Sequence, residues 1–178
     1  MLCELKTRES HPVAGRGAVM RRSAVMLELR RFEEADATGV WDLHNLALNE
    51  VGAHAGNGAW DADLRSVRAS YLDDGGEFLV GLLDGRLVAM GGLRPVTATI
   101  GEIKRMRVHP AHQRRGFGRL VLERLEASAV EGGYLKLRLE TTVRQDAAQQ
   151  LYRQAGYREV SRGHLAGFDV IFFEKRLR

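Results

Sequence analysis

The stretch from Glu102 to Leu122, EIKRMRVHPAHQRRGFGRLVL, constrains the fold of this chain most. Its pattern predicts a strand that ends near Pro110, a basic loop with two glycines, and a helix that follows directly. Proline ends the strand because it has no backbone N–H to donate to a sheet. A strand that leads through a glycine loop into a helix start is the arrangement that can hold a phosphate. We therefore expect an anion site where the loop meets the helix.

The loop itself, QRRGFG over residues 113–118, contains groups that suit a phosphate. Its glycines allow a tight bend and a close approach of the backbone to a ligand. The first N–H groups of the helix that begins near Phe117 have no partner within the helix and lie at the positive end of its dipole. Arg114, Arg115 and Arg119 add positive charge in a geometry that fits phosphate. Taken alone, the loop is equally compatible with a solvated basic turn.

The strand before the loop departs from strict alternation. Ile103, Met106 and Val108 cannot all face a core at a period of two residues. One extra residue near Lys104 or Arg105 would place them on one face, as a β-bulge does. We therefore predict a bulge there, with spare backbone groups that a ligand amide could use.

The pattern VxPxxQRRGFG resembles the acetyl-CoA signature of the GNAT N-acetyltransferase superfamily, with Gln113, Gly116 and Gly118 at its fixed positions. A later block that ends at Tyr157 is similar to the family's NxxAxxLYxxxGF block. Two positions depart from that block, because Gln145 replaces the usual Asn and Tyr157 replaces the usual Phe. The resemblance covers roughly residues 27–177, although only these two blocks are distinctive.

The resemblance implies that acetyl-CoA is the cosubstrate. The N–H groups of the loop would hold its pyrophosphate, and the backbone of the preceding strand would pair with the pantetheine arm like an added strand. The cofactor-binding residues expected on this basis are Met106, Arg107, Val108, Gln113, Arg114, Arg115, Gly116, Phe117, Gly118 and Arg119.

The resemblance also implies a catalytic role for Glu102. It stands fourteen positions before Gly116, the separation seen for the glutamate base of the histone acetyltransferase branch of the superfamily. Glu102 would then deprotonate the amine through water. The alternatives are a strand carboxylate paired with Lys104 or Arg105, or one that binds a cationic acceptor.

Tyr152 matches the family's tyrosine, which is the acid or hydrogen-bond partner of the CoA sulfur. A phenol with a pKa near ~10 can protonate a thiolate of comparable basicity. The alternative is that Tyr152 packs in the core, because it lies on the apolar side of its helix. The oxyanion would be bound by a backbone N–H at the bulge, that of Met106 or Arg107.

The rest of the chain predicts a mixed α/β (α+β) sheet with antiparallel hairpins at both ends and a crossover helix between two parallel central strands. A turn at Asp84-Gly85 joins two apolar strands, Asp36 and Asp63 start helices, and a helix stops at Gly132-Gly133. The resemblance adds six to seven strands, mostly antiparallel, about four helices, and splayed central parallel strands. Residues 26–178 are expected to form one domain and residues 1–25, which are polar and rich in arginine, a flexible tail.

Composition narrows the classes of partner. The chain has 178 residues, a net charge of +4 and one cysteine, Cys3, which excludes an internal disulfide and fits a reducing compartment. No apolar run is long enough for a membrane span, so we expect a cytoplasmic protein.

His109 and His112 have no acidic or cysteine partner at ligand spacing, so no metal is expected. No nucleic-acid-binding pattern is present, and the positive charge suits the phosphates of the cofactor.

We predict an acetyl-CoA-dependent N-acetyltransferase that transfers the acetyl group directly within a ternary complex. The expected acceptor is the primary amine of a small molecule, such as an amino acid, a polyamine or an amine antibiotic. The alternatives are a protein N-terminus or lysine, or a non-catalytic acyl-CoA-binding module. His44 and His54 are candidates for the acceptor site, although each is expected at the surface. Either a monomer or a homodimer is compatible with the sequence.

Overall fold

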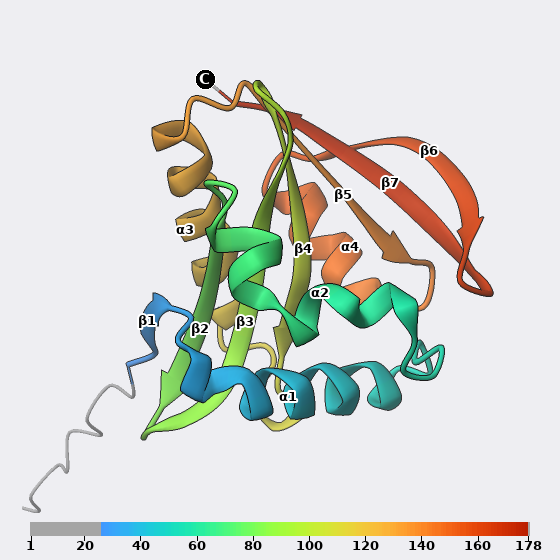
Figure 1. The fold of residues 1–178 in the computed structure, drawn as a ribbon. Coiled ribbons are helices and arrows are strands. Elements are labelled where there is room, and N and C mark those ends of the chain that lie inside the picture. Colours follow the sequence, from blue (N-terminus) through green and yellow to red (C-terminus); the bar gives the residue numbers. More distant parts are fainter. Residues whose placement is uncertain (1–25, 178) are drawn as a thin grey trace, which may run out of the picture.

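The computed structural model describes residues 26–177, so the predicted tail lies outside the described residues. Seven strands form one sheet in the order β1-β2-β3-β4-β5-β7-β6 (Figure 1). Within this part of the chain, only β4 and β5 run parallel, and the other neighbours are antiparallel. The predicted fold class is confirmed. The strands are β1 (Glu28–Arg31), β2 (Glu77–Leu83), β3 (Arg86–Thr97), β4 (Ile100–Val108), β5 (Lys136–Thr142), β6 (Arg158–Leu165) and β7 (Phe168–Arg176).

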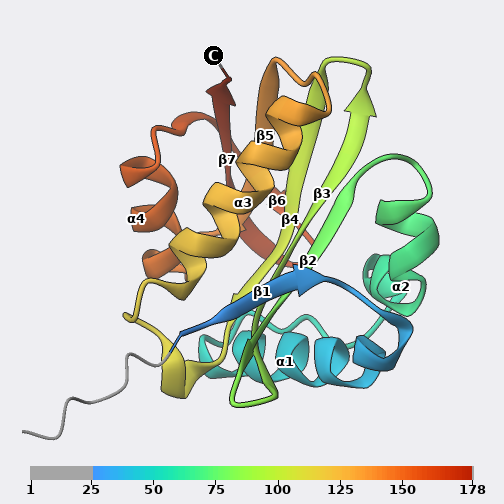
Figure 2. The ribbon, with the colours of Figure 1, turned by 90° about the vertical axis from the view of Figure 1, so that its left-hand side faces the viewer.

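Helices cover both faces of the sheet (Figures 1 and 2). On one face lie α3 (Phe117–Glu131), which connects the parallel strands β4 and β5, and α4 (Asp146–Gln154). On the other face lie α1 (Ala37–Glu50) and α2 (Ala62–Arg65). Short helical turns complete the set, namely η1 (Glu34–Asp36), η2 (Ala59–Asp61), η3 (Arg68–Leu72) and η4 (Pro110–His112).

The alternation of apolar residues along the strands builds two hydrophobic cores, one on each face. Leu79 of β2 packs in the core under α3, whereas its neighbours Phe78 and Val80 pack in the core under α1. This follows from the period of two residues in a strand, which sends successive side chains to opposite faces. Because β2 is buried on both faces, its sequence reads as a continuous apolar run.

Positive φ angles confirm two predictions, the hairpin turn at Asp84-Gly85 and the end of a helix at Gly132-Gly133. Asp84 and Gly85 have φ of 51° and 75° and form a two-residue turn between Leu83 and Arg86. Positive φ at both central residues is the geometry of a type I′ hairpin, which Asp-Gly favours. Gly133, with φ of 79°, lies just beyond the end of α3.

The second helix differs from its prediction. One helix was expected from Asp63 onward, but α2 ends at Arg65 and a π-helical turn, η3, follows at Arg68. Asp63 lies inside α2 rather than at its cap. Its carboxylate accepts hydrogen bonds from Arg105 and from the Tyr71 hydroxyl, so the side chain serves tertiary contacts instead of capping.

The predicted bulge in β4 is present. Met90 of β3 pairs with Arg107, but Gly92 pairs with Lys104, so β4 carries one residue more than β3 between these pairs. Arg105 within this interval has φ of 58°, in the left-handed region. As predicted, Ile103, Met106 and Val108 all pack against the core under α3.

The parallel strands β4 and β5 stay together over only three residue pairs. Ile100, Gly101 and Glu102 pair with Lys136, Leu137 and Arg138. Beyond these pairs, β4 continues against β3 alone and β5 against β7 alone. The two strands therefore splay apart in the middle of the sheet, as expected from the resemblance.

Candidate active site

The splay leaves one edge of β4 without a strand partner within residues 26–177. From Ile103 to Val108, β4 pairs only with β3. Backbone N–H and C=O groups on such an edge can bond an extended ligand in the manner of an added strand. The bulge at Arg105 alters the direction of the backbone at the same place.

The helix that follows begins with free donors. Gly116 is the N-cap of α3, with φ of 84°, and no side chain of the described residues caps this helix end. The first bond of the helix runs from Leu120 N–H to Gly116 O at 3.1 Å, so the N–H groups of residues 117–119 have no partner within the helix. A Cβ at position 116 would meet nothing within 4 Å. Glycine is therefore favoured here by the backbone conformation, which aims these donors at one point.

Three exposed arginines surround this helix start. Arg115 stacks its guanidinium over the Phe117 ring at 5.6 Å, and Arg119 bonds Gln154 Oε1 at 3.3 Å. No ion pair joins Arg114 or Arg115 to a carboxylate among residues 26–177. Their charge is therefore available to an anion, and the donors fit the pyrophosphate that the resemblance implies.

A cavity of about 380 Å³ lies between the splay, the loop and α4. Every predicted cofactor-binding residue except Arg115 lines it, and Tyr152 lines it as well. Ala47 of α1 and Val51, just beyond its end, form part of the wall. Gln113 bonds the carbonyl of Val108 through Nε2 at 3.4 Å and so ties the loop to the strand end. The structure thus brings most of the predicted set together around one space.

Gln145, which departs from the family pattern, holds the turn between β5 and α4. Its Oε1 accepts hydrogen bonds from Thr141 Oγ1 at 3.0 Å and from Thr142 N–H at 3.2 Å. The residue also lines the cavity. Glutamine, which is longer than the usual asparagine, therefore fits at this position because its side chain stabilises the turn.

Tyr152 packs in the core and also lines the cavity, so both of the roles that the sequence left open remain possible. Its ring is buried, with 4% of its surface exposed, and packs edge-on against Tyr157 at 5.8 Å between ring centroids. No hydrogen bond joins its hydroxyl to any residue of the described chain. Burial raises the pKa of Tyr152 to about 12, although the charge of Arg107 opposes this rise. The phenol is therefore protonated at neutral pH and can act as a donor at the cavity. Its catalytic role stays a prediction.

Glu102 lies where the splay begins, on the face opposite α3, and is held by cations. Its Oε2 accepts a hydrogen bond from Arg94 at 2.5 Å and its Oε1 accepts one from Arg138 at 3.1 Å. Lys104 lies 3.9 Å away, so one predicted pairing is present, whereas Arg105 is not a partner. Glu102 does not line the cavity that contains Tyr152. Its role as a base also stays a prediction.

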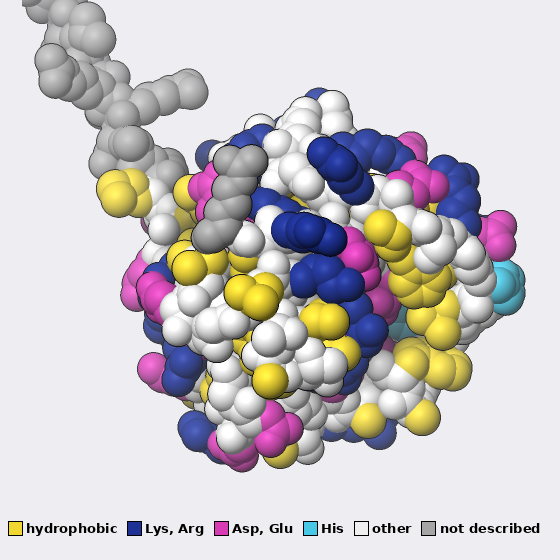
Figure 3. Space-filling view, turned by 90° about the horizontal axis from the view of Figure 1, so that it is seen from above, with side chains coloured by type: hydrophobic (Ala, Val, Ile, Leu, Met, Phe, Trp, Pro, Cys, Tyr) yellow, Lys and Arg dark blue, Asp and Glu magenta, His cyan; other side chains and the backbone are white. Residues whose placement is uncertain are grey.

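Figure 3 shows basic side chains gathered in the middle of the surface seen from above, with acidic side chains recessed beside them. Ion pairs also join the strands where β4 and β5 splay apart. Lys104 of β4, for instance, bonds Glu140 of β5 at 3.1 Å. The open face of the sheet is therefore lined by charges that hold one another in place.

Arg105 pins the segment between α1 and α2 to the bulge, a role that the sequence analysis missed. Its guanidinium bonds Asp63 at 2.5 and 2.9 Å, Asp61 at 3.1 Å, and the carbonyl of Trp60 at 2.5 Å. Burial by itself would lower the pKa of Arg105, but the two aspartates outweigh burial and raise it. The cation therefore stays charged in the interior.

His44 was expected at the surface, and this expectation was wrong. It is 1% exposed, and its Nε2 lies 3.2 Å from Asp61 Oδ1. Burial, with the charges of Arg107 and Arg105, lowers the pKa of His44 to about 3, so the imidazole is neutral. The sequence could have indicated this burial, because position 44 belongs to the helical spacing 40, 43, 44 and 47 that forms the buried face of α1.

Residues 26–177 contain no group of three or more His, Cys, Asp and Glu side chains placed to hold a metal ion. None of the helices in this part of the chain has both the length and the apolar character needed to cross a membrane.

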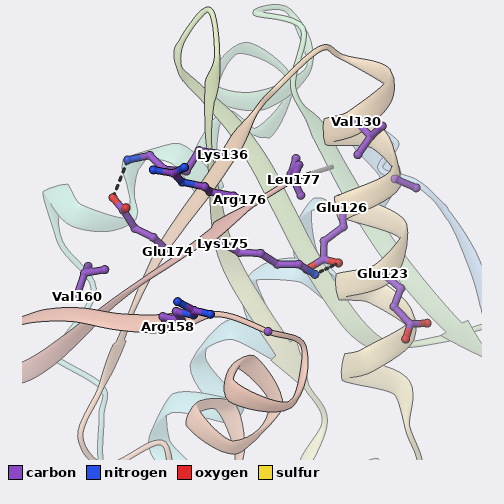
Figure 4. A pocket seen from close by; sticks show the side chains of 12 residues that line it. Glu123, Glu126, Val130, Lys136, Arg158, Val160, Glu174, Lys175, Arg176 and Leu177 are labelled. Atoms are coloured by element: carbon purple, nitrogen blue, oxygen red, sulfur yellow. Dashed lines mark hydrogen bonds and ion pairs between the residues drawn. The ribbon is translucent and has the colours of Figure 1, made fainter.

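A second hollow of about 1140 Å³ lies between α3, β6 and β7 (Figure 4). Its walls carry two ion pairs, Lys175 with Glu126 at 2.7 Å and Lys136 with Glu174 at 2.9 Å. None of the predicted site residues lines it. It is therefore separate from the site at the splay.

Comparison with known proteins agrees with this geometry. Residues 38–157, more than half of the chain, match the model of the acetyltransferase (GNAT) family. An "IAA acetyltransferase" from Azospirillum brasilense is 40% identical over 81 residues, which is 45% of this chain and about half (53%) of that relative.

Solved structures share the fold. A GNAT-family acetyltransferase from Staphylococcus aureus Mu50 superimposes with a TM-score of 0.80 at 17% identity, over 86% of this chain and all (100%) of that one. The structure of yncA from Salmonella typhimurium, solved with its cofactor acetyl-CoA, has a TM-score of 0.72 at 22% identity, over 85% of this chain and 94% of that one. Because the family model covers the strand, the loop and the later block, the chain belongs to the GNAT acetyltransferase family.

Proposed function

We propose that this protein is an acetyl-CoA-dependent N-acetyltransferase that acts on the primary amine of a small molecule by direct transfer. The observation that carries the proposal is the single cavity that joins three elements: the unpaired edge of β4, the uncapped start of α3, and Tyr152. Together these elements could hold an extended chain with a pyrophosphate at one end and a proton donor near the other.

In this mechanism the cosubstrate supplies the acetyl group as a thioester. Glu102 takes a proton from the amine through water, and the nitrogen then attacks the thioester carbonyl carbon. The N–H of Met106 or Arg107 donates to the carbonyl oxygen as negative charge develops. As the C–N bond forms and the C–S bond breaks, Tyr152 gives its proton to the departing sulfur and takes up the second proton that the nitrogen loses on becoming an amide.

A small acceptor is supported by a contact that spans the opening. Arg144, in the turn after β5, donates a hydrogen bond to the carbonyl of Gly52, just beyond α1, at 2.5 Å. Arg105 holds the segment between α1 and α2 against β4. Both ties narrow the acceptor side, which disfavours a long peptide.

The test is an assay of thiol release from acetyl-CoA with a panel of small amines and peptides. We expect turnover with small amines, and we expect Tyr152→Phe to lower kcat about 10- to 100-fold with little change in CoA affinity. Tyr157→Phe is the matched control, because Tyr157 packs against Tyr152 but does not line the cavity. If Tyr152→Phe and Tyr157→Phe were equally active, Tyr152 would not be the proton donor.

The variant Glu102→Gln distinguishes two possible roles of Glu102, that of a catalytic base and that of a structural partner for nearby arginines. A base predicts a loss in kcat of about 100-fold or more with CoA affinity preserved. An anchor for Arg94 and Arg138 predicts lower stability with kcat nearly unchanged. Glu140→Gln, on the same face but bonded only to Lys104, is the control. If the protein binds CoA but acetylates no amine or peptide, the non-catalytic acyl-CoA-binding module is the better description.

A further inference from the structure

Arg107 is a partly buried cation at the site, and it has no acidic partner among residues 26–177. Arg107 lines the cavity, and its single hydrogen bond within the described chain is from Nη1 to the carbonyl of the adjacent Met106, at 2.8 Å. Its Nε is fully buried and has no hydrogen-bond partner in the part of the chain that the structure describes. An unpaired charged group away from water is costly, so such a donor needs an explanation.

The neighbouring carboxylates are already engaged. Arg105 bonds both Asp61 and Asp63, and Asp61 also faces His44. Burial, with the like charge of Arg105, lowers the pKa of Arg107 to about 10, which still leaves it protonated at neutral pH. Within residues 26–177, a positive charge therefore lies at the cavity wall without a negative charge in contact with it.

The other cations of this region are paired. Arg94 and Arg138 both bond Glu102, and Lys104 bonds Glu140. With Arg105 and its partners Asp61 and Asp63 included, five cations face four carboxylates, so this region carries one positive charge in excess. A polycationic acceptor would be repelled there, whereas an acceptor with a negative group would be attracted.

The anion that pairs with Arg107 has to come from the acceptor. The charged groups of the cosubstrate are phosphates, for which the loop arginines and the start of α3 provide the donors. The pantetheine arm that would lie along Met106 to Val108 carries no charge, and neither does the thioester. The sulfur becomes negative only as it leaves, so before the reaction the acceptor is the remaining reactant that can bring an anion.

From this we infer that the acceptor is an amine that also carries a carboxylate, and that the guanidinium of Arg107 binds this carboxylate. This inference rests on the proposed function and specifies its substrate class. It favours amino acids and related amino carboxylates over polyamines and amine antibiotics. A planar guanidinium suits this role because it can donate two parallel hydrogen bonds to a carboxylate.

The test uses acceptor pairs that differ only in the carboxylate, namely tryptophan and tryptamine, histidine and histamine, and arginine and agmatine. For at least one pair we expect kcat/KM to be about 30-fold or more higher for the carboxylate, which is the usual range for loss of a charged hydrogen bond. Arg107→Gln should bring the ratio close to one, and Arg107→Lys should restore part of it. Thermal stabilisation by CoA, measured on each variant, reports whether the variant is folded.

Two outcomes would overturn the inference. The first is equal use of both members of every pair by the unsubstituted protein. The second is an equal loss for both members in Arg107→Gln, which would place the guanidinium at the CoA sulfur instead of the acceptor.

A binding measurement keeps the inference separate from the proposed function. Calorimetry of the CoA-saturated protein with N-acetyltryptophan and N-acetyltryptamine reads carboxylate recognition without turnover. We expect at least tenfold tighter binding of N-acetyltryptophan, lost in Arg107→Gln. If no amine is acetylated but this preference is found, the proposed function fails and the carboxylate site stands. If the preference is missing as well, the carboxylate site is refuted.

Discussion

Arg105 should be among the most sensitive positions for stability, because it joins the bulge to the segment between α1 and α2. Its side chain is 11% exposed, and its partners Asp61 and Asp63 are 4% and 11% exposed. Removing one partner of a buried ion pair costs about 3–5 kcal/mol, since the other charge is left unpaired. Asp63 keeps the Tyr71 hydroxyl and Asp61 keeps His44. We therefore expect Arg105→Ala to lower the free energy of unfolding by about 3 kcal/mol, the lower end of this range.

Arg105→Gly provides the matched comparison, because φ at this position is 58°. A residue with a Cβ is strained in the left-handed region by about 1–2 kcal/mol. Glycine avoids this strain but loses about 0.5–1 kcal/mol through greater freedom of the unfolded chain. We expect Arg105→Gly to be more stable than Arg105→Ala by about 0.5–1 kcal/mol, although it loses the same ion pairs.

The assay is urea unfolding at neutral pH, followed by circular dichroism, with the free energy of unfolding extrapolated to water. A loss in Arg105→Ala below about 1 kcal/mol would mean that the network does not stabilise the fold as a buried ion pair does. A glycine variant less stable than the alanine variant would show that the bulge at position 105 is not strained.

Other predictions concern pH, packing and the loop. His44 has a pKa of about 3 in the folded protein and ~6.5 when unfolded, so the unfolded state binds a proton first and stability falls as the pH is lowered through this window. Between pH 6 and 4 the loss is about 2.5 kcal/mol, and urea unfolding of His44→Asn should show a flatter profile; an unchanged slope would contradict this. Gly91→Ala should destabilise by about 1–3 kcal/mol, because a Cβ would lie 2.5 Å from Met106 Sδ; an unchanged melting temperature would refute the overlap. Arg114→Gln should weaken CoA binding more than Arg115→Gln, since only Arg114 lines the cavity. Calorimetry should show this difference shrinking at high salt, and equal effects would argue against the position of the loop.

Local features of the sequence predicted much of the site. The bulge could be inferred because Ile103 and Met106 are out of phase for one face, and the structure places both against α3. The start of α3 could be inferred from Gly116, whose φ of 84° suits glycine. The sequence placed Tyr152 on a helix. It could not show whether the side chain packs in the core or lines the cavity, because this depends on which elements pack beside the helix.

Contacts between distant residues could not be inferred. Arg105 bonds Asp63, which lies 42 positions away, and Arg138 bonds Glu102 from 36 positions away. The second contact exists because the parallel register pairs Glu102 with Arg138. Register is a property of the assembled sheet, so no local pattern reports it.

By itself, the sequence determined the order of strand, loop and helix, the position of the bulge and the charge around the loop, because these depend on chain geometry within a few residues. The tertiary structure alone decided which charges neutralise one another. In the folded protein Arg105 pairs with Asp61 and Asp63, and Glu102 pairs with Arg94 and Arg138. Arg107 lies at the cavity without an acidic partner among residues 26–177. The physical reason is that ion pairing depends on distances of a few ångströms between side chains, which are established only when the strands and helices pack.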